Sequence, residues 1–353
     1  MNRILITVAV AVLAVIGGYA VVSNLGDGEG AGSGVSGSDT APPESSDPVL
    51  GHVEVVAEYS SEIVVRAVPA DGASFYGWFS GDAMVSDRMF ETFDIGAVDG
   101  VEAVFNEGFT KSVEYAWEMP MFASDGSLSG MTRHEVVSIG LWSGDYWSAV
   151  QDDGRLRHAT YADPMPVFML SDSDAVDQVV EYLEPLVEGM TNYQKATVLA
   201  YFVQDVIDYE SDSSQYGVTE FWATPDETLY TGRGDCEDTA TLYVNIGARM
   251  GLDVGFVAFE DARMGHMSAA VALDDGETAR GNAVFEVDGV RYAYVETAID
   301  NAHSDVGQLS SAYRITDGNW TRVTYDSESG EYIGDSTVPI GTGTVTGAPM
   351  IYG

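Results

Sequence analysis

The chain has 353 residues, and its 45% hydrophobic content is enough to form ordinary buried cores, so disorder throughout the chain is not expected. Its 56 acidic and 15 basic residues give a formal net charge of −41 at pH 7. A surface this negative repels a phosphate backbone, which argues against nucleic acid as a partner. The acidic residues recur from Glu54 to Glu331. This pattern is typical of a solvated surface made for high salt, where screening shortens the reach of charge repulsion.

The N-terminus carries an uncharged stretch at residues 4–22, preceded by Arg3. A helix over this stretch would be about 28 Å long, close to the ~30 Å of a hydrocarbon core. We therefore predict a transmembrane anchor over residues 1–22. The alternative is a cleaved signal peptide, with Ala20 near the only weak cleavage site, but such peptides have apolar regions of roughly 7–15 residues. The basic flank predicts that residues from Ser23 onward face the exterior.

The next two segments differ sharply in composition. Residues 23–52 are dominated by Gly, Ser, Asp, Glu, Thr and Pro, so they predict a flexible acidic linker that cannot bury a core. Residues 53–107 alternate between apolar and polar side chains, with a turn at residues 69–72. Together with aromatic residues such as Phe75 and Trp78, this alternation predicts a small all-β domain.

The sequence "IVVRAVPADGASFYGWFSGD", followed by "DGVEAVF", resembles the small β repeat of bacterial surface proteins of the internalin B-repeat type. The resemblance implies a spacer or adhesion module without catalytic residues. Residues 108–170 contain apolar and aromatic runs at 113–117 and 166–170. We interpret these runs as strands in a β-rich segment that leads into the next domain.

Helical periodicity begins after Ser171. Apolar residues recur at helical spacing between Val176 and Val187, although Pro185 should kink or end this helix. A second helix is predicted to start at Thr191, because Gln194 stands three residues later in a capping-box spacing. Both helices should pack on the core of the domain.

The only cysteine of the chain is Cys236, so no intramolecular disulfide can form. Taken alone, such a residue is more often a small buried hydrophobic side chain. Here it follows the flexible turn at residues 231–234 and begins a predicted helix that Gly251 ends. A thiol at a helix N-terminus is stabilised as thiolate. The neighbouring carboxylates oppose this effect, so the thiol requires a positively charged partner.

His266 is the candidate for that partner. Residues 255–261 and 266–273 read as two strands, and His266 opens the second. A third strand over residues 290–298 carries Glu296, and antiparallel pairing would bring it beside His266. A nucleophile, a base and an orienting carboxylate are the groups that nucleophilic catalysis needs. Without further context, an isolated histidine is usually structural and an isolated glutamate usually a solvated charge.

The motif W-x-x-P-x-E-T-L-x-x-G-x-G-D-C-E-D-T-A, from Trp222 to Ala240, is similar to the nucleophile motif of the transglutaminase-like superfamily, especially its microbial cysteine-proteinase-like branch. "GHMSAAV" and "YAYVETA" match the histidine and acid strands of that family. The resemblance implies an α+β fold with a papain-like core, in which a nucleophile-bearing helix packs on an antiparallel sheet. It implies Cys236, His266 and Glu296 as the catalytic residues. We assign residues 171–305 to this core and 306–353 to a C-terminal extension.

The chain departs from the family at the acid position, where most members have aspartate. Here Glu296 stands, and Asp300 four residues later is the alternative. Gln204 and Trp222 are candidates for completing the oxyanion hole. The consecutive carboxylates around Cys236 should point in different directions on a helix, so we expect no metal site, and no cofactor is implied.

Together these observations predict a membrane-anchored enzyme of the cell exterior that acts on amide bonds of a protein or peptide through a thioester. Hydrolysis of the peptidase type is favoured, because the resemblance is to the proteinase-like branch and no amine-binding feature is visible. The alternatives are a protein-glutamine acyl transferase and a surface adhesion or scaffold protein that no longer catalyses. The sequence determines neither the substrate nor the oligomeric state.

Overall fold

A computed structural model describes most of the chain from residue 50 onward, namely residues 50–98, 100–144, 146–147, 166–260, 265–281, 283–299, 303–309 and 318–340. The predicted anchor at 1–22 and nearly all of the predicted linker lie outside the described residues, as does Asp300. Among the described helices, none combines the length and the hydrophobicity needed to cross a bilayer. The chain divides into two compact units after Gly108.

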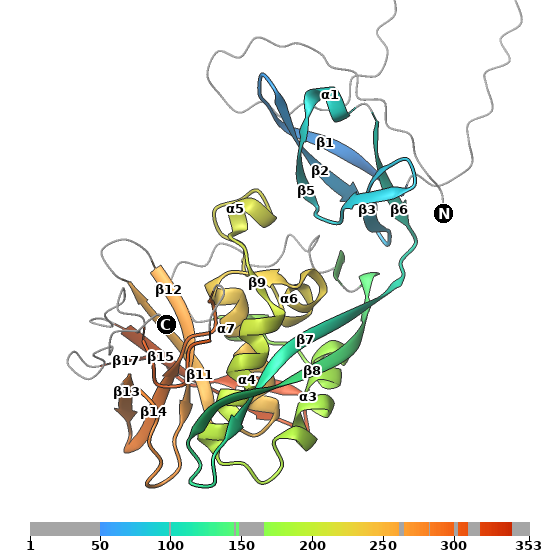
Figure 1. The fold of residues 1–353 in the computed structure, drawn as a ribbon. Coiled ribbons are helices and arrows are strands. Elements are labelled where there is room, and N and C mark those ends of the chain that lie inside the picture. The colour runs from blue at the N-terminus through green and yellow to red at the C-terminus, as the bar shows by residue number, and fades with distance from the viewer. Residues whose placement is uncertain are drawn as a thin grey trace, which may run out of the picture. The chain divides into compact units, whose positions relative to one another are not determined.

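The smaller unit consists of two three-stranded sheets with the strand orders β1-β2-β5 and β4-β3-β6 (Figure 1). Its core is aromatic: the ring centroids of Phe75 and Trp78 are 5.3 Å apart, and those of Phe75 and Phe105 5.6 Å apart. The strands expected in this region are therefore present, with one short helical turn between them. Its elements are β1 (Gly51–Glu58), β2 (Glu62–Pro69), β3 (Ser74–Ser80), β4 (Ala83–Ser86), β5 (Phe90–Asp94), α1 (Ile95–Val98) and β6 (Val101–Asn106).

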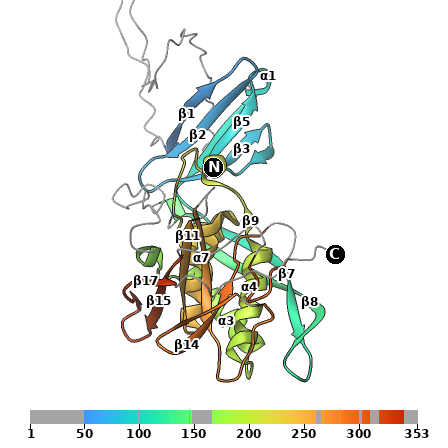
Figure 2. The same ribbon diagram turned by 90° about the vertical axis from the view of Figure 1, so that its left-hand side faces the viewer.

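The larger unit contains a seven-stranded antiparallel sheet of order β13-β14-β12-β11-β15-β16, with β17 also paired to β15. Helices α7 and α4 pack against this sheet, and α3 packs against α7. The long ribbon β7–β8 lies against α4 and α3 (Figures 1 and 2). The sheet strands are β11 (Val254–Glu260), β12 (Gly265–Ala272), β13 (Val284–Val287), β14 (Val290–Val295), β15 (Gly318–Asp326), β16 (Glu331–Gly334) and β17 (Val338–Ile340). The other elements are β7 (Thr110–Phe122), β8 (Leu128–Trp142), α3 (Asp174–Leu183), η2 (Glu184–Leu186), α4 (Asn192–Val206), β9 (Asp208–Tyr209), α5 (Asp212–Gln215), α6 (Pro225–Thr231), β10 (Arg233–Gly234) and α7 (Cys236–Arg249).

The helix boundaries follow the sequence signals closely. Thr191 and Gln194 form the predicted capping box, with the Thr191 N–H donating to Gln194 Oε1 at 3.1 Å and the Gln194 N–H to Thr191 Oγ1 at 3.4 Å. α3 ends just before Pro185 and continues as the 3-10 turn η2, because proline supplies no N–H to an α-helix. α7 begins at Cys236, and Gly251 just beyond its end has a φ of +75°. All three predictions are confirmed.

One predicted strand is wrong. Residues 166–170 were expected to be extended, but they begin with the 3-10 turn η1 (Pro166–Met169). The fixed φ of proline near −65° and its missing N–H suit the first turn of a helix better than the interior of a sheet. The β-rich part of this lead-in is instead the ribbon β7–β8.

The C-terminal strands belong to the core sheet and do not form a separate extension. β15 pairs antiparallel with β11, from Val254 opposite Val323 to Ala258 opposite Asn319. On its other edge it pairs with β16 and β17. A strand whose partner lies far away in the sequence gives no local signal of the sheet that it joins, which explains why the assignment of residues 306–353 missed it.

Polar contacts from its buried face fix the position of α7. The fully buried Asn245 donates from Nδ2 to the Ser171 carbonyl at 3.0 Å and accepts from the Tyr332 hydroxyl. Near the C-terminus of the helix, the Arg249 guanidinium pairs with Asp172 at 2.7 Å and also with Asp177. The helix that begins at Cys236 is therefore held at its middle and at its far end.

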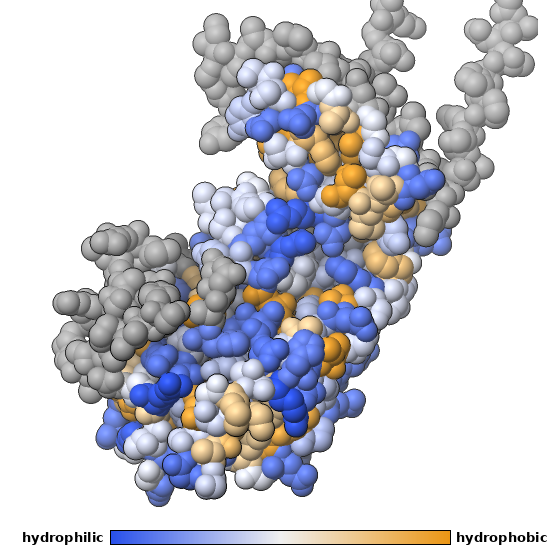
Figure 3. Space-filling model, in the orientation of Figure 1, coloured by the Kyte–Doolittle hydropathy of each residue, from blue (hydrophilic) through white to orange (hydrophobic). Residues whose placement is uncertain are grey.

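Hydrophilic side chains cover most of the face of the larger unit that Figure 3 shows, with hydrophobic ones scattered among them. The most exposed large apolar residues of the ribbon are Met131 and Val136, at 61% and 49% exposure. Single exposed apolar residues are normal on protein surfaces. The high-salt interpretation of the acidic surface stays a prediction.

The close approach of β11 to β15 leads to a first prediction. A Cβ on Gly255 would lie 2.8 Å from the Arg322 Cα and would also overlap the Thr321 carbonyl oxygen. Gly255→Ala should therefore lower the free energy of unfolding, by about 1–3 kcal/mol for an overpacked core. Gly247→Ala is the control, because its Cβ would meet no atom nearer than 3.5 Å and alanine favours a helix by about 0.5–1 kcal/mol. Thermal unfolding measures both; equal losses would contradict the argument.

Candidate active site

The turn before α7 places Cys236 at the start of the helix. β10 pairs in parallel with β9 just before the cysteine. The fully buried Asp238 accepts hydrogen bonds from the Ala223 N–H at 2.7 Å and the Asp235 N–H at 3.3 Å, which ties the turn to the preceding loop. A Cβ on Gly234 would come within 2.7 Å of the Asp238 Cβ. Glycine is therefore required where the backbone passes this carboxylate.

The structure brings His266 and Glu296 together. β12 and β14 pair antiparallel, as predicted, with Ala270 opposite Tyr294. His266 lies near the start of β12 and Glu296 directly follows β14, and each is only 4% exposed. The His266 Nε2 lies 3.1 Å from Glu296 Oε1 and 3.2 Å from Oε2.

The partners of Glu296 determine the tautomer of the histidine. Its carboxylate also accepts from the Tyr294 hydroxyl at 2.8 Å, the Thr297 N–H at 3.1 Å and the Ala298 N–H at 3.4 Å. Both oxygens of this carboxylate act as acceptors in these contacts, so the imidazole nitrogen that faces them is the donor. We therefore place the proton of His266 on Nε2, which leaves the lone pair on Nδ1.

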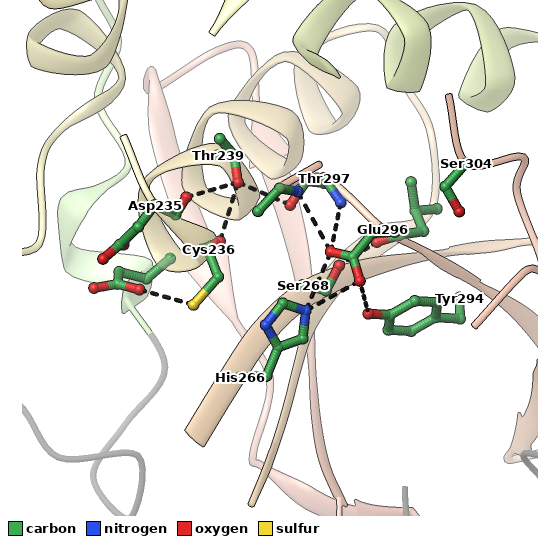
Figure 4. A network of polar contacts seen from close by, with 12 residues as sticks. Asp235, Cys236, Thr239, His266, Ser268, Tyr294, Glu296, Thr297 and Ser304 are labelled. Carbon is green, nitrogen blue, oxygen red and sulfur yellow. Dashed lines mark hydrogen bonds and ion pairs between the residues drawn. The ribbon is translucent and has the colours of Figure 1, made fainter. Parts of the chain in front are cut away.

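Cys236 lies on the other side of the imidazole. Figure 4 shows its sulfur and the ring nitrogen of His266 not bound to Glu296 turned toward one another. The nitrogen with the lone pair thus faces the thiol, the arrangement a general base needs. The thiol itself donates to Glu237 Oε2 at 3.1 Å, and the cysteine is 9% exposed.

The surroundings of the sulfur keep the thiol protonated. Burial raises the pKa of Cys236 well above its usual range, and the charges of Glu237 and Asp235 raise it further. The Met267 N–H, from the strand that carries His266, donates toward the sulfur and acts in the opposite direction. The electrostatic opposition expected from the neighbouring carboxylates is therefore present, and the helix N-terminus does not overcome it.

Carboxyl groups converge beside the thiol. Oxygens of Asp212, Asp235 and Asp238 lie within 4.8 Å of one another, as do those of Asp212, Glu220 and Glu237. The expectation that the carboxylates around Cys236 point apart is wrong, because the turn before α7 and α5 fold them onto one another. Asp212 and Glu220 could not be found from the sequence, since Asp212 begins the short helix α5, Glu220 lies in the loop after it, and neither belongs to a motif.

These carboxyl groups could hold a divalent cation. Burial raises the pKa of Asp212 to about 8, and it also raises the pKa values of Asp235, Glu237 and Asp238. Asp212 Oδ1 and Asp235 Oδ1 are buried without a hydrogen-bond partner. Oxygen donors of this kind fit a hard cation such as Ca²⁺, which takes several carboxylate ligands.

The two side chains considered for the oxyanion hole are committed elsewhere. Gln204 Nε2 donates to the Glu296 carbonyl at 2.6 Å and the Ser304 carbonyl at 3.1 Å, which uses both of its hydrogens. The single N–H of the Trp222 indole donates to Glu220 at 2.6 Å. A developing oxyanion would instead meet the positive end of α7, where the first N–H groups have no partner within the helix.

A pair of threonines, missed by the sequence analysis, links the two halves of the site. The Thr239 hydroxyl lies 3.1 Å from the Thr297 hydroxyl and 2.9 Å from the Asp235 carbonyl (Figure 4). Thr239 belongs to the first turn after Cys236, and Thr297 follows Glu296. The contact thus ties the nucleophile helix to the acid. Threonine gives no periodic signal that would identify such a role.

Comparison with known proteins supports the family resemblance of the larger unit but not that of the smaller one. Residues 181–281 match the profile of the transglutaminase-like superfamily core. No curated protein matches the chain. The resemblance of residues 53–107 to internalin B repeats gains no support.

Two solved structures show weak likeness. One is a TGase, 13% identical with a TM-score of 0.28, where the match covers 68% of this chain and 59% of the other. The second is a candidate cysteine protease from Cytophaga hutchinsonii, 9% identical with a TM-score of 0.27 over 83% of this chain and 92% of the other. Neither score supports an argument. The profile match spans Cys236 and His266, so residues 181–281 of this chain form a domain of the transglutaminase-like superfamily.

Proposed function

We propose that this protein is a cysteine-dependent enzyme that acts on amide bonds through a thioester, with Cys236 as nucleophile, His266 as base and Glu296 as orienting acid. The observation that carries the proposal is the arrangement in Figure 4, where the imidazole of His266 contacts the Glu296 carboxylate on one side and faces the Cys236 sulfur on the other. The membership of this domain in the transglutaminase-like superfamily supports it.

The reaction begins with the movement of the thiol proton. His266 Nδ1 accepts this proton while the sulfur attacks the amide carbonyl carbon, and the resulting oxyanion lies near the N-terminus of α7. The imidazolium then protonates the departing nitrogen, the C–N bond breaks and a thioester remains. Water or an amine next attacks the thioester with His266 again as base, which releases an acid or a new amide and restores the thiol.

The surrounding charges act differently on the two ions of the first step. The thiolate is disfavoured by burial and by its carboxylate neighbours. The imidazolium is favoured by Glu296, which contacts it, and by Asp235, whose charge interacts with His266. The thiol is therefore protonated at rest, and the thiolate–imidazolium pair forms as the substrate is attacked.

We favour hydrolysis of a peptide or protein over acyl transfer, because the nucleophile motif resembles the proteinase-like branch. Fluorescent casein with and without dansylcadaverine separates the two reactions. Hydrolysis releases short peptides in either case, whereas acyl transfer attaches the dansyl group to intact casein. A protein that serves only as a scaffold does neither.

The catalytic roles lead to a second prediction. Cys236→Ala and His266→Ala should lower acylation by p-nitrophenyl acetate at least about 1000-fold, whereas Glu296→Gln should lower it about 100-fold, because the imidazole remains but loses its orienting charge. Asp300→Asn is the control and should stay near the wild-type rate. Circular dichroism confirms that each variant folds. Substantial acylation of Cys236→Ala would exclude the nucleophile, and a larger defect in Asp300→Asn would move the acid.

The converging carboxylates lead to a third prediction. A cation bound by Asp212, Asp235 and Asp238 would stabilise the folded state by mass action. The gain would be about 2.7 kcal/mol at a cation concentration 100 times its dissociation constant. Millimolar CaCl₂ should raise the midpoint of thermal unfolding above its value in EDTA. Asp212→Asn should remove this calcium-dependent shift, whereas Glu286→Gln, an exposed carboxylate on β13, should leave it unchanged. Equal midpoints in calcium and EDTA would show that the carboxyl cluster holds no cation.

Location is a fourth prediction and depends on the sequence alone. We propose that residues 1–22 anchor the enzyme and that the domains lie outside the membrane. Protease added to intact cells should then digest both units, while a cytoplasmic marker protein stays intact. If the protease digests neither unit in cells whose marker protein also stays intact, the two units lie on the cytoplasmic side and the predicted orientation is wrong.

A further inference from the structure

The register of the sheet places the acid at a diagonal from the histidine. The ladder between β12 and β14 ends with Ala269 opposite Val295. If this register continued, the residue directly opposite His266 would be Ala298. Glu296 is thus a diagonal neighbour, two positions away, and diagonal pairs are roughly 7–8 Å apart and within reach only of long side chains. Glutamate spans this distance, as the 3.1 Å contact with His266 shows.

A second side chain controls where the end of this long carboxylate lies. The Tyr294 hydroxyl donates to Glu296 Oε2 at 2.8 Å, while the Thr297 and Ala298 N–H groups donate to Oε1. Each oxygen therefore has its own donor, and both face His266 almost equally, at 3.1 and 3.2 Å. The tyrosine fixes the half of the carboxylate that the backbone does not.

The tyrosine ring is itself rigidly held. Tyr294 is fully buried in the core cluster of the sheet, where Phe259 packs with its ring centroid 6.4 Å away. The same Phe259 contacts the His266 ring edge-on at 5.3 Å. One core residue thus supports both the base and the donor that holds the acid, so the hydroxyl position is set by the packing of the sheet.

We propose that Tyr294 is a positioning residue and that, together with the register, it makes glutamate necessary as the third catalytic residue of this enzyme. An aspartate at the same position is shorter by one C–C bond, about 1.5 Å. Its carboxylate cannot meet the Tyr294 hydroxyl and the His266 Nε2 together. The inference rests on the proposed function, because a positioning role requires that the imidazole act as a base.

The test is a double-mutant cycle on acylation, measured as the burst of p-nitrophenolate from p-nitrophenyl acetate. Tyr294→Phe should slow acylation about tenfold, because a hydrogen bond to a charged group is lost from the acid. In the Glu296→Gln background the same change should cost less than about twofold, since the charge it positions is already gone. Glu296→Asp should be slowed as much as Glu296→Gln.

Tyr292→Phe is the matched control. Tyr292 lies two residues earlier on the same face of β14, is 3% exposed and directs its hydroxyl to Asp253 at 3.3 Å, away from His266. It should stay within about twofold of the parent in both backgrounds. Equal slowing by Tyr294→Phe in both backgrounds, or no more slowing than in Tyr292→Phe, would overturn the positioning role.

Two further outcomes separate this inference from the proposed function. A wild-type protein that gives no burst, although iodoacetamide labels Cys236, would refute the proposed function and the positioning role with it. A wild-type burst together with equal slowing by Tyr294→Phe in the wild-type and Glu296→Gln backgrounds would refute the positioning role alone. If Tyr294→Phe does not fold, Glu296→Asp decides, because a rate near wild type would show that glutamate is not required.

Discussion

The site depends on one buried hydrogen bond, between His266 and Glu296. Two titratable groups that are each 4% exposed can remain together only if every polar atom is satisfied, since an unpaired charge in the interior is costly. The two backbone N–H groups, the Tyr294 hydroxyl and His266 Nε2 meet this requirement for both oxygens of the Glu296 carboxylate. The imidazole is then fixed in the tautomer whose Nδ1 lone pair faces the thiol. The start of α7 places the sulfur of Cys236 beside this nitrogen.

Side-chain hydrogen bonds join the helix that begins at Cys236 to the segment that carries Glu296, and they fix the positions of these two elements relative to one another. The Thr239–Thr297 hydroxyl pair crosses from one to the other, and Gln204 holds both ends of the segment that follows Glu296 by contacts with Glu296 and Ser304. Each contact is modest, at about 1 kcal/mol. Their value is positional, because a shift of either element would separate sulfur from nitrogen.

Much of this could be predicted from the sequence. The capping box at Thr191, the start of α7 at Cys236 and the pairing of the strands that carry His266 and Glu296 follow from local signals such as cap residues and alternation. The converging carboxylates and the place of β15 beside β11 could not be predicted, because they depend on partners distant in sequence. The direction of a side chain in a turn, such as that of Asp235, is likewise set by the tertiary structure.

The high pKa of Cys236 also affects the chemical durability of the enzyme. Peroxides and disulfides react with thiolates, and sulfenic acid forms only as fast as the thiolate is populated and reachable. The thiol of a cysteine that is 9% exposed, protonated at rest, is protected on both counts. The chain has no second cysteine that could form a disulfide with an oxidised Cys236 and so return it to the thiol. Slow oxidation of Cys236 is therefore the protection that the chain's own residues provide.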